Sequence, residues 1–65
     1  MFDADKFKKV VREKGLTLQE VADYLKIDKS TLYRKMNGGS DFYRSEMQLL
    51  CNLLSLKDPT EIFSA

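Results

Sequence analysis

The sequence predicts a compact all-α domain of five short helices, and three observations support this fold class. Apolar residues recur at the spacing of helix faces, without the sustained alternation that marks a β-strand. Strong breakers interrupt the chain at only three places: Gly15, residues 37–41 and residues 57–59. Residues typical of helix N-caps precede most of the apolar segments. Because no stretch has the composition of a linker, we expect residues 1–65 to form a single domain.

The first helix is expected at about residues 4–14. Its apolar face comprises Phe7, Val10, Val11 and the stem of Lys14. Asp3 or Asp5 gives the helix an acidic start, and Gly15 readily adopts the left-handed conformation with which many helices end.

The second helix is the best marked. Thr17 lies three residues before Glu20, which is the spacing of a reciprocal capping box, and Leu16 is placed to pack against Val21. The apolar face of this helix comprises Leu18, Val21, Ala22 and Leu25. A third helix is expected at residues 29–36, with Asp28 as its N-cap and a thin apolar stripe. That stripe comprises Leu32 and Met36, and the helix ends at Asn37 and Gly38.

The fourth helix is expected at about residues 44–54. Its inward residues are predicted to be Met47, Leu50, Cys51 and Leu54. A short fifth helix follows, with Asp58 as N-cap and Pro59 at the first helical position. Ile62 and Phe63 make this last helix apolar.

Composition narrows the class of function. The 65 residues include one Cys and no His, which excludes an internal disulfide and the usual Cys/His zinc sites. No apolar run approaches the roughly 20 residues that span a bilayer, and no signal-type stretch is present. No acid–base or nucleophile constellation stands out. We therefore expect a reduced, cytoplasmic protein that is not an enzyme and has no cofactor, metal, membrane or small-molecule partner.

Residues 17–37 have the organisation of a helix-turn-helix, in which a short turn joins two helices. Ala22 is small enough for the two helices to cross closely, and Ile27 and Leu32 are placed to fill the corner between them. The second of these helices, at residues 29–36, is mostly polar and so is able to present one face to a partner.

The segment from Leu16 to Gly38 reads LTLQEVADYLKIDKSTLYRKMNG and resembles the helix-turn-helix of the Cro/CI-type phage repressor family, also called the XRE family. The resemblance extends more weakly across nearly the whole chain. It implies a five-helix, lambda-repressor-like domain that binds operator DNA, with the helix at residues 29–36 in the major groove.

The resemblance also implies roles for individual residues. The base-reading positions of the family fall on Lys29, Ser30, Tyr33 and Arg34. The phosphate-contacting positions fall on Thr17, Gln19, Thr31, Asn37 and Arg44, where Gln19 stands in for a family glutamine whose place is taken by Leu18.

Two further departures from the family pattern bear on the helix-turn-helix. Lys26 occupies the turn position where the family usually has Gly, so a left-handed backbone there costs on the order of 1 kcal/mol. The second apolar anchor of the recognition helix normally lies three residues after Leu32, but Lys35 stands there and Met36 follows it. The sequence therefore leaves open whether Tyr33 or Lys35 faces the groove.

We predict a transcriptional regulator that binds double-stranded operator DNA as a homodimer, because a single recognition helix reads only a few base pairs. The alternative is a helical protein-interaction module, such as an antirepressor-like partner that keeps the fold without DNA binding. The net charge of only +1 favours the alternative. However, residues 1–36 hold nine Lys/Arg against six Asp/Glu, and residues 37–65 hold two against four. The predicted recognition helix thus lies in the basic half.

Overall fold

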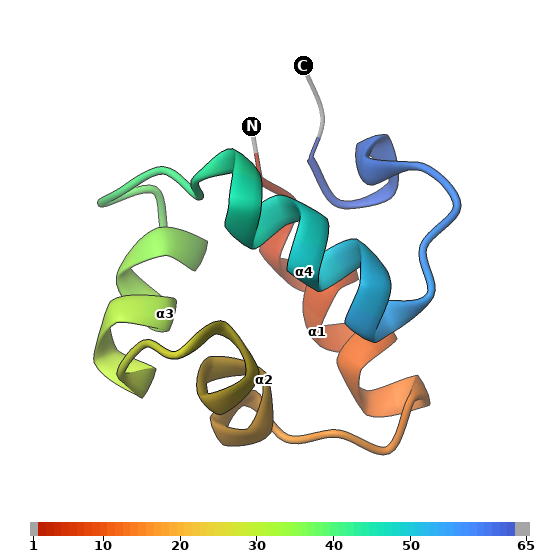
Figure 1. Ribbon diagram of the computed structural model, residues 1–65, viewed down its shortest axis with the longest axis horizontal. Helices are drawn as coiled ribbons and strands as arrows, with labels where there is room; N and C mark the ends of the chain where they lie inside the picture. Colours follow the sequence, from red (N-terminus) through yellow and green to blue (C-terminus); the bar gives the residue numbers. More distant parts are fainter. Residues whose placement is uncertain (1, 64–65) are drawn as a thin grey trace.

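The computed structural model describes residues 2–63, and within them it contains four α-helices, one 3₁₀-helix and a single isolated β-bridge (Figure 1). The elements are α1 (Ala4–Glu13), α2 (Leu18–Leu25), α3 (Lys29–Met36), α4 (Arg44–Leu54) and the 3₁₀-helix η1 (Pro59–Glu61). The predicted all-α class is confirmed. None of the helices in these residues is long and apolar enough to cross a membrane.

The expected fifth α-helix is instead the short 3₁₀-helix η1. Its start agrees with the sequence, since Asp58 accepts a hydrogen bond from the Thr60 amide at 3.0 Å and Pro59 occupies the first position. The helix does not continue, because the backbone leaves the helical conformation at Ile62 (φ −124°, ψ −16°), whose side chain is fully buried. Phe63 then forms the β-bridge with Phe2. Packing of these apolar residues into the body of the protein ends the helix after one turn.

The first two helices begin as the sequence predicts. Asp3 caps α1 by accepting a hydrogen bond from the Lys6 amide at 3.0 Å. The capping box of α2 is complete, with the Glu20 amide donating to Thr17 Oγ1 at 3.1 Å and the Thr17 amide donating to Glu20 Oε1 at 2.9 Å. These bonds satisfy amides that have no partner within the helix. Gly15 adopts a left-handed conformation (φ 71°) just after α1.

The start of α3 differs from the expectation. Asp28 occupies the N-cap position with an extended backbone, but its side chain makes no capping hydrogen bond. The turn before it is held by the backbone instead, because the amides of Lys26 and Ile27 donate to the Asp23 and Ala22 carbonyls at 3.1 and 3.0 Å. The helix-turn-helix therefore depends on the C-terminal end of α2 for its geometry.

One apolar core is formed by residues of the four α-helices together with Ile62, which follows η1. Its buried members are Phe7, Val11, Val21, Ala22, Leu25, Leu32, Met36, Leu50, Leu54 and Ile62. On α4 the prediction is partly wrong, because Met47 and Cys51 are only half-buried while Glu46 is buried. Residues 46, 50 and 54 are spaced four apart and so share one helix face. That face turns inward, and a charged residue lies on it.

Four phenylalanine rings pack together where the N-terminal and C-terminal segments of the described chain meet. The rings of Phe2, Phe42 and Phe63 lie within 4.7–5.5 Å of one another, and Phe7 joins them through Phe2 at 5.1 Å. The Asp3 amide also donates to the Ile62 carbonyl at 2.8 Å. Tilted and edge-on pairs of this kind stabilise beyond their buried area. The cluster therefore fixes the loop that contains Phe42 to both terminal segments.

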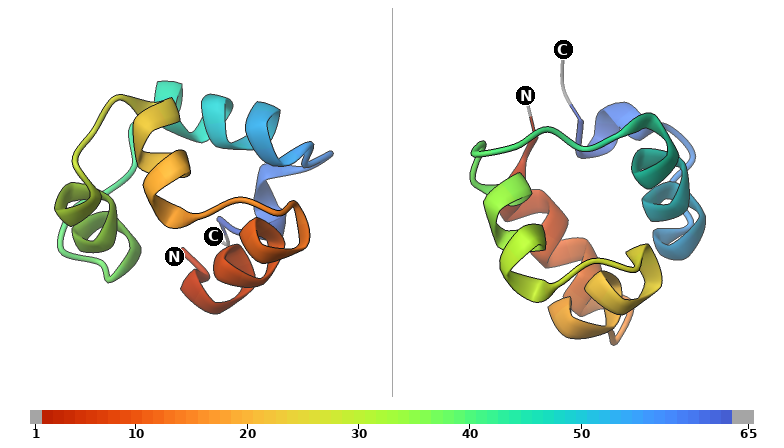
Figure 2. Two further views of the ribbon diagram at one scale, coloured as in Figure 1. Left: turned by 90° about the horizontal axis from the view of Figure 1, so that it is seen from below. Right: turned by 60° about the vertical axis from the view of Figure 1, so that its left-hand side comes forward.

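The helix-turn-helix lies at one end of the molecule. α2 packs against both α3 and α4, and η1 packs against α4. The views in Figures 1 and 2 place α3 and η1 on opposite sides. One face of α3 consequently remains uncovered by the rest of the described chain.

Candidate nucleic-acid interface

The uncovered face of α3 consists of polar side chains. Leu32, Lys35 and Met36 are the buried residues of this helix. Successive residues turn by about 100° around an α-helix, so the side opposite these three is formed by other positions. These outward positions are Ser30, Tyr33, Arg34 and Asn37, and all of them are exposed. Of the two residues between which the sequence did not decide, Tyr33 is 39% exposed and Lys35 only 6%.

Lys29 and Tyr33 form a pair on one side of this face. They are one helical turn apart, and the Lys29 Nζ atom lies 5.8 Å from the centre of the Tyr33 ring. A cation at this distance from an aromatic face is attracted by it, although weakly at an exposed site. The pair therefore restrains two long side chains that the sequence assigned to base reading.

The loop after α3 restricts the position of Arg34. The Gly39 amide donates to the Arg34 carbonyl at 2.8 Å, which brings the loop back over the helix. A Cβ atom at Gly39 would lie only 2.8 Å from Arg34 Cγ. The stem of Arg34 thus lies directly against the loop backbone, and glycine is the residue that permits this approach.

The N-terminus of α2 carries two of the predicted phosphate contacts. Thr17 Oγ1 accepts the capping bond from Glu20, but a hydroxyl in this position still has its own hydrogen to donate. Gln19 is less free, because its Nε2 atom donates to Asp23 Oδ1 at 3.0 Å. Both residues are exposed. Thr17 is therefore better placed than Gln19 to meet a phosphate.

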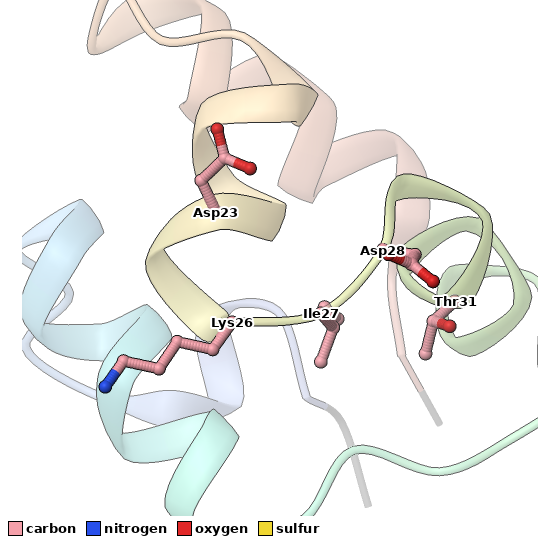
Figure 3. Close-up of a pocket in the computed structure, with 5 residues that line it drawn as sticks. All are labelled: Asp23, Lys26, Ile27, Asp28 and Thr31. Carbon is pink, nitrogen blue, oxygen red and sulfur yellow. The ribbon is translucent and has the colours of Figure 1, made fainter.

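Thr31 lies apart from the outward face. It is half-buried and lines a shallow hollow of about 450 Å³ together with three residues of the turn and one of α2 (Figure 3). The other lining residues are Asp23, Lys26, Ile27 and Asp28. In Figure 3 the Lys26 side chain extends away from Thr31, so its ammonium group does not lie beside the Thr31 hydroxyl. Two carboxylates line the same hollow, which makes it unfavourable for an anion.

Asn37 and Arg44 flank the loop that follows α3. Asn37 is exposed at the C-cap of α3, next to the outward face. Arg44 is the first residue of α4 and lines a hollow with Met47, Cys51 and Pro59, to which α3 contributes no residue. The structure therefore places Asn37 beside the residues predicted to read bases, whereas Arg44 lies apart from them.

Lys35 makes contacts that the sequence did not predict. Its Nζ atom lies 2.7 Å from Glu46 Oε1 in a buried salt bridge and donates to the Asp41 carbonyl at 3.2 Å. The same Nζ lies 4.2 Å from the centre of the Tyr43 ring, which is itself 70% exposed. The available signal was a pair of charged residues at positions where the helical pattern requires apolar ones, Lys35 on α3 and Glu46 on α4.

The salt bridge changes the distribution of charge. The ammonium of Lys35 is neutralised by Glu46, so eight basic residues are left against six acidic ones in residues 1–36. Glu46 also belongs to the acidic half of the sequence and yet packs against α3. The acidic half of the sequence is therefore not wholly separate from α3 in the structure. The positive charge on the outward face comes from Lys29 and Arg34.

Cys51 is the only thiol, and its surroundings do not activate it. It is half-buried on α4, and desolvation raises its pKa, with the negative charges of Glu61 and Asp58 acting in the same direction. A higher pKa leaves less of the nucleophilic thiolate at neutral pH. Within residues 2–63, no group of three or more His, Cys, Asp or Glu side chains is arranged to hold a metal ion.

Two short helices joined by a tight turn, the second with a polar face open to solvent, define a helix-turn-helix DNA-binding domain. The comparison with protein families agrees. Residues 6–65 match the Cro/C1-type HTH DNA-binding domain, and the chain belongs to this family. Double-stranded DNA is accordingly its partner class. The chain has no significant match among curated proteins or among solved structures.

Proposed function

We propose that the protein is a sequence-specific transcriptional regulator of the phage or prophage repressor type, which inserts α3 into the major groove of operator DNA. The observation that carries this proposal is the outward face of α3, where Tyr33 and Arg34 are exposed opposite a fully buried Leu32. A helix of this width fits the major groove, in which each base pair shows a distinct pattern of donors and acceptors.

The four base-reading residues have complementary chemistry. Arg34 carries a planar fork of donors that suits guanine O6 and N7, and Ser30 both donates and accepts hydrogen bonds. Lys29 and Tyr33 act together at the edge of the face, where the ring restrains the ammonium. We assign base reading to these four residues, with Arg34 as the main determinant of sequence preference.

Phosphate contacts supply most of the affinity of such domains. We assign them to Thr17 and Asn37 first, because the hydroxyl of Thr17 has a free hydrogen and Asn37 is exposed beside the outward face. Gln19, Thr31 and Arg44 are weaker candidates. The Gln19 amide is hydrogen-bonded to Asp23, and Thr31 lines the hollow at the turn. Arg44 lines the hollow between α4 and η1.

We further propose that the protein acts as a homodimer in the bacterial cytoplasm, where operator DNA lies. The balance of free charge on residues 1–36 is small, so a single copy has little non-specific attraction for DNA. Two copies on a palindromic operator double both the phosphate contacts and the number of bases read.

One observation favours a second candidate, a helical interaction module that does not bind DNA. Leu18 stands where a polar phosphate contact is expected, and the neighbouring Gln19 amide is held by Asp23. The N-terminus of α2 consequently offers fewer donors than a strong DNA reader would have.

Selection from a pool of random duplexes separates the two candidates. A DNA regulator enriches a defined sequence, and its affinity for that duplex falls steeply as the salt concentration rises. Failure to enrich any sequence, combined with no binding to duplex DNA at low salt, would contradict the proposal and favour the interaction module.

A further inference from the structure

Lys35 is held by a cluster of contacts that we call the Lys35 latch, comprising Lys35, Asp41, Tyr43 and Glu46. The Lys35 ammonium meets the Glu46 carboxylate at 2.7 Å, the Asp41 carbonyl at 3.2 Å and the Tyr43 ring at 4.2 Å. Glu46 Oε1 also accepts from the Tyr43 amide at 2.8 Å. Every buried side-chain nitrogen and oxygen in the described residues has a hydrogen-bond partner. No buried side-chain nitrogen or oxygen of the latch is therefore left without a hydrogen-bond partner.

Stability alone does not explain this network. The side chains of Lys35 and Glu46 are only 6% and 9% exposed, so both charges are largely removed from water. Replacing a buried ion pair by apolar residues of similar volume often leaves stability unchanged or increases it. The reason is that the attraction between the two charges must first offset the free energy lost when both are removed from water. An apolar residue at position 35 would complete the stripe of Leu32 and Met36. An ion pair differs from an apolar contact in that its hydrogen bonds form only in one relative orientation of the two side chains. It therefore fixes the geometry of the segments that carry them.

The latch connects α3 to the loop that positions Arg34. It joins the last turn of α3 to the backbone of the loop at Asp41 and to the first turn of α4 at Glu46. Within the same loop, the Gly39 amide bonds the Arg34 carbonyl, and the Gly39 backbone lies against the Arg34 stem. The position of this loop consequently determines where the Arg34 side chain is able to lie.

We propose that Lys35 is a positioning residue for DNA reading, which acts through the loop to direct Arg34 toward the base edges. Lys35 itself makes no contact with DNA, because it is buried. This inference rests on the proposed function of α3 as a recognition helix. It predicts that the latch affects the discrimination between DNA sequences more than the stability of the fold.

The variant that tests this is the double substitution Lys35→Met with Glu46→Gln. Methionine fills most of the volume of the lysine stem, and glutamine at the third position of α4 retains the hydrogen bond to the Tyr43 amide. The net charge of the protein does not change, so an effect on DNA binding cannot arise from overall charge. Lys35→Met alone would leave the Glu46 charge buried without a cation and is expected to destabilise the fold.

Dissociation constants are measured at a temperature at which thermal unfolding shows each variant to be fully folded. The probes are one duplex enriched by the wild type from a random pool and a duplex of the same composition in scrambled order. We expect the double variant to bind the enriched duplex about tenfold more weakly and the scrambled duplex nearly as the wild type does. The single variant Lys35→Arg, which retains the cation beside Glu46, should keep most of the affinity of the wild type for the enriched duplex.

A double-mutant cycle tests whether the latch affects DNA binding through Arg34. In an Arg34→Ala background the latch substitutions should weaken binding to the enriched duplex little further, because the residue through which they act is absent. Unchanged affinity of the double variant, an equal loss on both duplexes, or full additivity with Arg34→Ala would each overturn the inference. A wild type that enriches no duplex would overturn the proposed function, and this inference with it, before any variant is compared.

Discussion

The backbone at Lys26 is left-handed, with φ 60° and ψ 42°, at the end of α2. For a residue with a Cβ atom this conformation costs roughly 1–2 kcal/mol, whereas glycine adopts it freely. We expect Lys26→Gly to raise the free energy of unfolding by about 1 kcal/mol, after allowance for the greater freedom of glycine in the unfolded chain. Urea denaturation measures the change.

Lys26→Ala is the matched control for that substitution. It removes the ammonium but keeps the Cβ atom, so we expect its stability to stay close to that of the wild type. An equal gain from alanine and glycine would show that charge, rather than backbone strain, is responsible. DNA affinity should be unaffected by Lys26→Gly, since the Lys26 side chain points away from Thr31 and α3 in Figure 3.

Among the residues to which we assign base reading, we expect Arg34 to contribute most to sequence preference. It is exposed on α3 and its stem is held against Gly39. Arg34→Ala should relax the sequence preference at one position of the operator and cost about 1–3 kcal/mol of binding free energy. Repeating the selection with the variant measures both effects.

Thr31→Ala provides the contrast to Arg34→Ala. A phosphate contact carries no sequence information, so its loss weakens binding to all duplexes alike. If Thr31 in its half-buried position contacts no phosphate, the substitution will leave affinity unchanged. A loss that depended on sequence would show that Thr31, rather than Arg34, reads a base.

The thiol of Cys51 should react slowly. Burial and the nearby carboxylates raise its pKa, so the thiolate fraction at neutral pH is below that of a free cysteine. We expect alkylation by iodoacetamide at pH 7 to be slower in the folded protein than in urea, and the difference to shrink as the pH rises above the pKa of the folded state. Equal rates in the folded and unfolded protein would contradict this assignment.

At the scale of the helices, the capping box of α2 links stability to DNA binding. Thr17 contributes a hydroxyl that satisfies the Glu20 amide and is also our first candidate for a phosphate contact. Thr17→Ala should lower the free energy of unfolding by about 1 kcal/mol. Thr17→Ser keeps the hydroxyl and is expected to retain both stability and affinity. A serine variant as unstable as the alanine variant would show that the methyl group, not the cap, is what matters.

The helices themselves were largely predictable from local signals. The capping box at Thr17, the left-handed Gly15 and the apolar stripes of α1 and α2 depend on residues close together in the chain. The capping box and Gly15 were confirmed, and most of each stripe is buried or half-buried, but Lys14 is exposed beyond the end of α1. The fifth helix was not predictable in the same way. Its last residues pair with Phe2, more than fifty positions earlier, and no local pattern contains that contact.

The candidate site shows the same division between local and distant causes. The exposure of Ser30 and Arg34 followed from the phase of α3, which Leu32 already sets. The burial of Lys35 did not, because the charge is stabilised by Glu46, eleven residues later on another helix. Periodicity treats a charged residue as a surface residue. A charge at an expected apolar position is a signal that the pattern is broken, but periodicity alone does not show that Lys35 pairs with Glu46.

For the whole molecule, the decisive quantity is its size relative to a turn of DNA. α3 has eight residues and is about 12 Å long, so one copy reads only part of one turn. The Cα trace measures 27 × 26 × 21 Å. Two copies on successive major grooves, with centres about 34 Å apart, therefore fit side by side on one face of the duplex, close enough for their side chains to meet.

This geometry predicts how binding depends on the spacing of the two half-sites. Inserting about five base pairs, half a turn, places the second copy on the opposite face of the DNA, and inserting about ten places it a full turn too far away for molecules of this size to touch. We expect both insertions to abolish cooperative binding and to leave the affinity of a single half-site unchanged. Gel-shift titrations of the three duplexes measure this, because cooperative binding suppresses the singly occupied complex.

If the two copies bound with the same pair of affinities to the original duplex and to the duplex with five inserted base pairs, binding would not depend on contact between the copies. The proposed dimer would then be excluded. If the ten-base-pair insertion alone restored cooperativity, the coupling would pass through the DNA, since the proteins are too small to contact each other across two turns.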